Sequence, residues 1–268
     1  MKRITMLLSM LLLVGLGFAE NMEAEWEEVI SIHYIAHFKL YAEANGEITE
    51  EKVLDVGENG SCFYGRFQRR REEIVDSITA AGGSQEELFG KINEYPSPRQ
   101  FYAIYNNCPS AGKRTVTDRV IQRFHYVEDI DQIEWTLLDR DTTILGYQCQ
   151  MASCQYRNHR WNVCYTPEIP VALGPWKLQG LPGLILYAAD STGIFSFECI
   201  EIRNNSRKIA QPNLTRSIQC SREEIKSLQR ESLSNPEEFV KRFGATGKGT
   251  DANGRPIVYK KKTALFMD

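Results

Sequence analysis

The stretch from residue 146 to residue 190 constrains the fold more than any other part of the chain. It begins with two strand-like runs that are separated by a short turn. Three prolines follow, Pro167, Pro170 and Pro175, and each fixes φ and removes a backbone donor. A segment with this spacing of prolines cannot lie inside a sheet. We therefore expect it to cross one end of a sheet in an extended and rigid form.

The pair Arg157-Asn158 predicts a two-residue hairpin turn between strands at 143–154 and 160–166. Such a turn sets the register of the two strands, because it fixes which residues face each other. The expected pairs are Tyr156 with His159, Cys154 with Trp161, and Met151 with Cys164. Alternation then assigns Ala152, Cys154, Trp161, Val163 and Tyr165 to the core face, and Cys149, Met151, Asn162 and Cys164 to the opposite face.

The sulfur-bearing face of this hairpin is a candidate metal site. Cys149, Met151 and Cys164 are soft ligands of the kind that suits a copper(I)-like ion, and His159 is a further candidate ligand. Sulfur side chains on one strand pair also serve as packing groups. The register places Cys149 and Cys164 diagonally, about 7 Å apart or more, which is too far for an unstrained disulfide. Metal binding and packing both stay open at this point.

The hexapeptide 180–185 follows the prolines and predicts a sharp turn that leads into a buried strand. Glycine and proline at its start favour the turn. The residues after the turn are apolar on both faces of a strand, which is typical of a buried strand. We therefore interpret the six residues as structural, with Gly180, Pro182 and Gly183 in the turn and Leu181, Leu184 and Ile185 in the core.

The runs YTPEIP at 165–170, GPW at 174–176 and GLPGLIL at 180–186 together resemble the GLPGLI family of exported bacterial proteins. The resemblance covers roughly residues 135–202. One departure is Cys164, which stands where the family usually has an aromatic residue. The resemblance implies an extracytoplasmic protein, often found beside outer-membrane transport systems. The family has no established activity, so the resemblance carries no catalytic residue over to this chain.

Residues 1–19 have the three parts of a secretory signal peptide. Lys2 and Arg3 give a positive start, residues 6–18 are almost wholly apolar, and Ala19 ends the segment. The apolar run is shorter than the roughly 20 residues that span a membrane. We expect cleavage before Glu20 and a single sheet-rich domain over residues 20–268. No second apolar run of membrane length follows, so an exported, soluble protein, periplasmic or secreted, is predicted.

Charge and cysteine content exclude some classes of function. The formal net charge is −3, and it becomes −5 once Lys2 and Arg3 are removed. A mildly acidic domain is a poor match for nucleic acid, which attracts clustered basic residues. Seven cysteines in an exported chain suggest oxidising surroundings, and an odd number leaves at least one unpaired within the chain. No CxxC spacing supports a thioredoxin-like pair or a zinc ribbon.

The remaining patterns predict an α+β protein. We expect one curved, mostly antiparallel sheet of about eight strands, compatible with a half-barrel, with a few short helices on one side. Ser221 with Glu224 forms a capping-box pattern, and Pro236 marks the first turn of another helix. The predicted strands are 29–42, 61–67, 116–127, 133–138, 143–154, 160–166, 184–189, 194–202 and an edge strand at 255–262; helices are predicted at 70–81 and 85–92, and a turn at 139–141.

These features favour a non-enzymatic binding or accessory protein. The chain has 12 Phe, 12 Tyr and 4 Trp, which suits a concave face that holds an apolar ligand or a peptide of an outer-membrane transport component. Neither a Gly-x-Ser-x-Gly elbow nor a His-Glu-x-x-His motif is present, and no cofactor is predicted. The alternative is an extracytoplasmic metal or redox protein that uses Cys149, Met151, His159 and Cys164.

Overall fold

The computed structural model describes residues 25–204, 208–212, 214–215, 217–244, 255–256 and 258–268. The signal peptide predicted at 1–19 lies outside the described residues, as does most of the Gly-rich stretch after Gly244.

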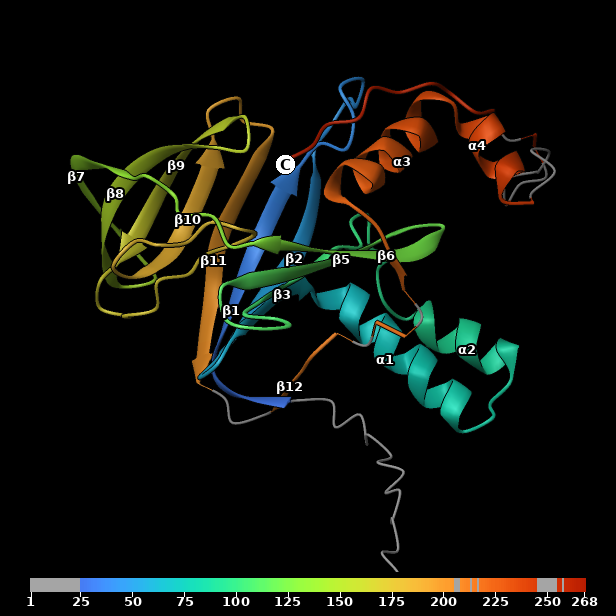
Figure 1. Ribbon diagram of the computed structural model, residues 1–268, viewed down its shortest axis with the longest axis horizontal. Helices are drawn as coiled ribbons and strands as arrows, with labels where there is room; N and C mark the ends of the chain where they lie inside the picture. Colours follow the sequence, from blue (N-terminus) through green and yellow to red (C-terminus); the bar gives the residue numbers. More distant parts are fainter. Residues whose placement is uncertain (1–24, 205–207, 213, 216, 245–254, 257) are drawn as a thin grey trace, which may run out of the picture.

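The described residues form thirteen strands and four helices (Figure 1). A sheet-rich α+β protein with a few short helices is therefore confirmed. The helices are α1 (Arg66–Ala80), α2 (Gln85–Ile92), α3 (Arg222–Ser234) and α4 (Pro236–Arg242). The strands are β1 (Glu25–Phe38), β2 (Ile48–Gly57), β3 (Ser61–Gly65), β4 (Ala103–Asn106), β5 (Lys113–Val120), β6 (Gln122–Asp129), β7 (Thr136–Ile144), β8 (Tyr147–Tyr156), β9 (His159–Thr166), β10 (Leu184–Asp190), β11 (Phe195–Asn204), β12 (Lys208–Ala210) and β13 (Ile218–Gln219).

The strands make one large mixed sheet that is not closed. Its order is β13-β6-β5-β4-β3-β2-β1-β11-β10-β9-β8-β7, and β12 pairs with the beginning of β1. Neighbouring strands are antiparallel except for β13, which runs parallel to β6. The long β1 pairs with β2 on one side and β11 on the other, so it joins the two halves of the sheet (Figure 1).

The estimate of about eight strands is wrong, because the prediction omitted β2, β4, β12 and β13 and merged β5 with β6. The stretch read as one strand at 116–127 is two strands, β5 and β6, with Ile121 between them at a φ of 72°. The turn expected at 139–141 lies inside β7, where the pairing with β8 shifts register. The chain instead turns at Leu145 and Gly146, whose φ angles are 50° and 86°. Isoleucine and leucine rarely adopt positive φ, so the turns at Ile121 and Leu145 could not be recognised from the sequence.

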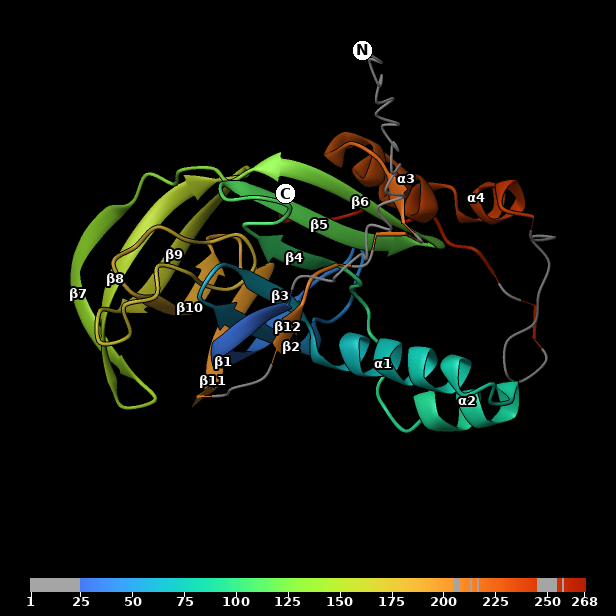
Figure 2. The ribbon, with the colours of Figure 1, turned by 60° about the horizontal axis from the view of Figure 1, so that its bottom comes forward.

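The helices lie on both faces of the sheet and not on one side, which corrects the prediction (Figure 2). Strands β2 to β4 carry apolar residues on both faces, so each face needs a covering layer. One face carries Leu54, Phe63, Ile104 and Val116, and Ile225 of α3 belongs to the same core. The other face carries Val53, Cys62, Tyr64, Ala103 and Tyr105, and α1 lies against β2 and β3 on that side.

The helix ends follow the sequence closely. Ser221 accepts a hydrogen bond from the Glu224 backbone, and the Glu224 side chain accepts one from the Ser221 backbone, so the capping box is confirmed. Pro236 opens α4 and α2 spans the predicted residues. Helix α1 begins earlier than expected, because β3 ends at Gly65.

The edge strand predicted at 255–262 is not formed in the part of that segment the structure describes. Further on, the chain contacts the residues that follow β1: Ala264 makes an isolated bridge with Tyr41, and the Leu265 backbone donates to Leu40. The Lys262 ammonium in this segment lies 3.8 Å from the centre of the Tyr41 ring.

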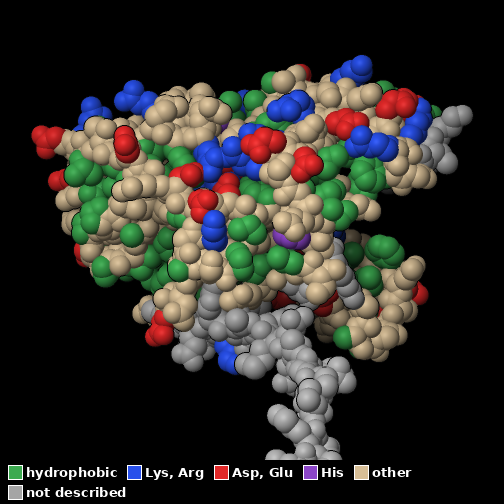
Figure 3. Space-filling view, in the orientation of Figure 1, with side chains coloured by type: hydrophobic (Ala, Val, Ile, Leu, Met, Phe, Trp, Pro, Cys, Tyr) green, Lys and Arg blue, Asp and Glu red, His purple; other side chains and the backbone are tan. Residues whose placement is uncertain are grey.

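Charged side chains of both signs are interspersed on the face shown in Figure 3. The outline of this face is notched on the right, between the α3–α4 pair above and the α1–α2 pair below. Among the described residues, no helix combines the length and the hydrophobicity needed to cross a membrane.

Candidate functional site

The hairpin of β8 and β9 has the predicted register. Arg157 and Asn158 adopt φ angles of 50° and 67°, as a two-residue hairpin turn requires. The structure pairs Tyr156 with His159 and Met151 with Cys164, and it also pairs Cys154 with Trp161. The register is therefore confirmed, but the assignment of Cys149 and Cys164 to a face opposite the core is wrong, because both belong to the hydrophobic core.

Two of the three sulfur-bearing candidates are buried in this sheet, and Met151 is partly buried. Cys149 and Cys164 are almost fully buried, and burial raises the pKa of the Cys164 thiol to about 11. His159 lies five positions from Cys164 along β9, roughly 16 Å away, so the structure does not bring it to Cys149 and Met151. All seven cysteines are free thiols. No group of three or more His, Cys, Asp or Glu side chains in the described ranges could hold a metal ion.

His159 contacts two acceptors at the other end of the hairpin. Its Nδ1 lies 3.1 Å from an Asp190 carboxylate oxygen, and its Nε2 lies 2.8 Å from the Phe266 carbonyl oxygen. Burial opposes ionisation of Asp190, but the backbone N–H of Phe195 and the side chains of Thr192 and His159 outweigh it and lower the pKa of Asp190. His159 thus joins the segment 263–268 to the sheet.

The hexapeptide 180–185 forms a tight turn before β10. Gly180 lies at a φ of 95°, a conformation that favours glycine. A Cβ on Gly183 would lie 2.1 Å from the carbonyl oxygen of Thr166, so only glycine fits there. Leu184 and Ile185 are fully buried at the start of β10, whereas Pro182 is exposed.

The proline-rich segment before this turn carries two side chains into the interior. Trp176, at a φ of 57°, lies 5.6 Å from Trp161 and 5.6 Å from Tyr156 between ring centres. Lys177 follows it and is buried, with its side chain 1% exposed. The crossing segment therefore positions a buried aromatic ring and a buried cation side by side.

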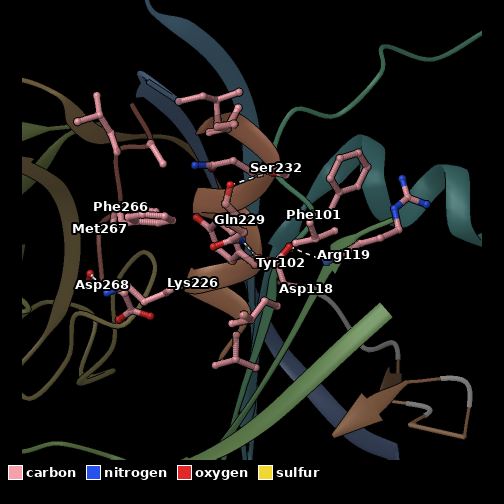
Figure 4. A pocket seen from close by; sticks show the side chains of 18 of the residues that line it. Phe101, Tyr102, Asp118, Arg119, Lys226, Gln229, Ser232, Phe266, Met267 and Asp268 are labelled. Atoms are coloured by element: carbon pink, nitrogen blue, oxygen red, sulfur yellow. Dashed lines mark hydrogen bonds between the residues drawn. The ribbon is translucent and has the colours of Figure 1, made fainter. Parts of the chain in front are cut away.

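These two residues line a cavity of about 460 Å³. The cavity lies between strands β4 to β6, helix α3 and residues 264–268 (Figure 4). Small-molecule pockets in proteins usually have volumes of roughly 300–1,000 Å³, so this cavity is large enough for a ligand. Its wall is largely apolar, with Ile104, Val116, Trp176, Phe195, Ile225 and Phe266 among the lining residues.

Tyr102 is the first polar group of interest in this cavity. Its hydroxyl oxygen is buried and has no hydrogen-bond partner among the described residues. The ring itself is well held, because it stacks on Phe63 with 6.3 Å between ring centres and the Lys52 ammonium lies 5.0 Å from its centre. Burial raises the pKa of Tyr102 well above its usual value, so the group stays a neutral donor. A buried donor without a partner is costly and points to a ligand or functional role.

Asp118 is the second polar group. Its carboxylate accepts hydrogen bonds from the Gln229 side chain and from the Arg119 backbone, each at 2.7 Å. Burial raises the pKa of Asp118 to about 6 despite these donors. Figure 4 shows Tyr102, Asp118 and Gln229 between the segment of Phe266 and Met267 on one side and Phe101 and Arg119 on the other.

An ionic cluster closes the end of the cavity near Trp176. Lys177 lies 2.8 Å from Glu128 and 2.8 Å from Asp268, and the Tyr126 hydroxyl donates to Asp268 at 3.2 Å. Arg157 lies 3.3 Å from Glu128. Every charged group here thus has at least one partner of opposite sign.

Sequence reasoning missed this cavity. Tyr102 lies between the predicted helix at 85–92 and the predicted strand at 116–127, where no element was predicted, and Asp118 lies in a strand whose ends were misplaced. One pattern in the sequence did indicate a polar group in the interior. Asp118 lies two residues from Val116 and two from Val120, so the three side chains share one face of the strand, and all three line the cavity. Lys177 lies between the apolar residues Trp176 and Leu178, a pattern that likewise indicates a charged side chain among apolar neighbours.

No protein-family model and no curated protein matches this sequence. Among solved structures, the chain is similar to PNGF-II in its P21 and C2 space groups, with a TM-score of 0.50 in both cases. The sequence identities are 13% and 12%, over 77% of this chain. The chain spans about a third of the length of PNGF-II, 34% and 33% in the two structures. At this identity the likeness concerns the fold alone.

Proposed function

We propose that this protein is a non-enzymatic binding protein that holds a small, largely apolar molecule in the cavity beneath α3. The observation that carries the proposal is the cavity of ligand size, which is lined by Tyr102, a residue whose buried hydroxyl has no hydrogen-bond partner among the described residues. A ligand with a polar group would accept the hydrogen bond that Tyr102 cannot make within the protein. Its apolar part would lie against the aromatic and aliphatic wall.

The polar groups of the cavity support binding more than catalysis. Asp118 is the cavity carboxylate with a pKa near neutral, which is a property that catalytic acids also have. Its partners, however, are the Gln229 amide and a backbone N–H, neither of which is a nucleophile. With these donors, Asp118 is suited to accept a hydrogen bond from a ligand hydroxyl.

The setting of the protein is part of the same proposal. The features of residues 1–19 support export to the periplasm or beyond, and the motifs at 165–186 support membership of the GLPGLI family. A half-barrel form of the open sheet, of the kind seen in periplasmic lipoprotein carriers, would place the cavity on its concave side; the likeness to those carriers is one of fold alone. A role beside an outer-membrane transport component follows from the family resemblance.

Native mass spectrometry of the folded protein, after incubation with an extract of bacterial lipids, tests the proposal. We expect one small molecule per chain to stay bound, and we expect Tyr102→Phe to retain less of it. A chain that carries no bound molecule under these conditions would count against a binding role.

The alternative is a copper-like site at Cys149, Met151 and Cys164, supported by the direct pairing of Met151 with Cys164. Metal binding requires the thiolate, whereas burial raises the pKa of both cysteines and favours the thiol. Titration with copper(I) against a competing chelator tests this alternative. Binding that Met151→Leu abolishes and His159→Ala leaves unchanged would support it.

A further inference from the structure

Asp268 occupies a built anion site at one end of the cavity. The Lys177 ammonium donates to its two carboxylate oxygens at 2.9 and 2.8 Å, and the Tyr126 hydroxyl donates at 3.2 Å. Lys177 is almost fully buried, so this cation is held in place and is poorly hydrated. The Lys226 ammonium also donates to the backbone carbonyl of Asp268. The Arg157 guanidinium lies 3.8 Å from the Asp268 carboxylate, so three cations and a phenol converge on this one residue.

The charges around the site need an anion at this position. Arg114 lies 3.5 Å from Glu128, and Arg157 lies 2.5 Å from Asp131, so the other carboxylates are already paired. Without Asp268 the cluster would hold more cations than carboxylates, and an excess buried charge is strongly unfavourable. Three cations would then face two carboxylates: Arg114, Arg157 and Lys177 against Glu128 and Asp131.

The segment that brings Asp268 to the site is attached by separate contacts and not by a strand ladder: the Lys262 backbone donates to Leu233, the Thr263 backbone and hydroxyl donate to Glu43, and Met267 is buried in the core. Two backbone hydrogen bonds join it to the chain after β1, from Ala42 to Thr263 and from Leu265 to Leu40. The Phe266 carbonyl contacts His159. A sheet strand of similar length would make a continuous ladder of such bonds, so this segment can leave at a smaller cost.

The anion site and the cavity form one space. Lys177, Tyr126 and Asp268 line the cavity, as do the rings of Trp176 and Phe195. Figure 4 shows Asp268 at the end of the segment that carries Phe266 and Met267 along the cavity. A molecule with an apolar body and a carboxylate end would match both parts at once.

We propose that this anion site receives the carboxylate of an amphipathic ligand, such as a medium-chain fatty acid or an aryl carboxylate, and that Asp268 is an internal carboxylate that such a ligand displaces. The inference rests on the proposed function, because it assigns the ligand class to the same cavity. Tyr102 and Asp118, further along the cavity, would contact a second polar group of the ligand when one is present.

Calorimetric titration with dodecanoate and with dodecanol tests the proposal in three full-length proteins: the wild type, Asp268→Asn and Asp139→Asn. Asp139 is exposed in β7, so its variant has the same change of net charge at a remote position. We expect Asp268→Asn to bind dodecanoate about tenfold more tightly than the wild type, because Lys177 then lacks its internal carboxylate. Dodecanol affinity should be unchanged, and Asp139→Asn should match the wild type for both probes.

Circular dichroism establishes that each variant is folded, and Lys177→Met in the Asp268→Asn background should remove the gain for dodecanoate. Equal gains for dodecanoate and dodecanol would overturn the inference, since they would show only that the segment has loosened. If dodecanol binds but the acid gains nothing in Asp268→Asn, the binding role stands and the anion site fails. If neither probe binds any variant, the proposed function and this inference fail together.

Discussion

Replacement of Tyr102 by phenylalanine should stabilise the protein and weaken ligand binding. The change removes only the hydroxyl, because the ring keeps its stack on Phe63 and its contact with the Lys52 ammonium. The hydroxyl is buried without a partner among the described residues, and such a group costs about 1–3 kcal/mol. We expect the free energy of unfolding to rise by about 1 kcal/mol, and the affinity for dodecanol to fall about fivefold through loss of one hydrogen bond.

Urea unfolding followed by circular dichroism measures the stability, and Tyr126→Phe is the matched control. The Tyr126 hydroxyl accepts a hydrogen bond from Lys177 at 3.1 Å and donates one to Asp268 at 3.2 Å. The same chemical deletion should therefore lower the free energy of unfolding by about 1–2 kcal/mol at this position. If Tyr102→Phe lost as much stability as Tyr126→Phe, the Tyr102 hydroxyl would have a partner in the folded protein, and the reasoning would be refuted.

Three further predictions concern the turn, the cavity carboxylate and the thiols. Gly183→Ala should destabilise the protein by about 3 kcal/mol, because the added Cβ would clash with the Thr166 carbonyl oxygen. The control Gly90→Ala in α2 has free space around it and should stabilise the protein by about 0.5–1 kcal/mol. Equal effects of the two variants in urea unfolding would contradict the clash at Gly183. The pKa of Asp118 is raised from 3.8 to about 6 in the folded protein, so the free energy of unfolding should fall as the pH rises from about 4 to about 6. Asp118→Asn should remove this part of the pH dependence. A wild-type stability that rises over this pH range relative to the variant would contradict the raised pKa. In the native protein, Cys220 should react first with a thiol reagent, because it is half-buried whereas the other six cysteines are buried. Cys154 should react late, because burial raises the pKa of its thiol to about 12. Peptide mapping that finds Cys154 labelled first would disprove this order.

The sequence was most informative where local chemistry decides the structure. The Arg157-Asn158 pair fixed the hairpin register, because a two-residue turn leaves only one pairing of the flanking strands. The Ser221–Glu224 capping box and Pro236 marked helix starts for the same reason, since each acts within one helical turn.

Where the backbone departs from common turn chemistry, the prediction failed. Ile121 and Leu145 adopt positive φ without glycine or asparagine, so the strands around them were merged or displaced. Their conformations are imposed by the pairing of long strands on each side, which is tertiary information.

The cavity could not be predicted because its walls come from distant parts of the chain. Tyr102 precedes β4, Asp118 lies in β5, Gln229 lies in α3, and Asp268 lies in the segment that follows α4 and the undescribed stretch after it. No spacing in the sequence links these residues. The alternation of Asp118 with apolar neighbours indicated a buried carboxylate, but it did not indicate what faces it.

Titration with the fluorescent apolar probe N-phenyl-1-naphthylamine tests the central claim, that the cavity beneath α3 binds a small molecule. The protein would be compared as wild type, as Ser232→Trp, which places a large ring on the cavity wall, and as Ser227→Trp, which makes the same change at an exposed position of the same helix. We expect saturable binding of one probe per chain to the wild type and to Ser227→Trp, and loss of this binding in Ser232→Trp. Equal binding by all three folded proteins, or binding by none of them, would contradict the central claim.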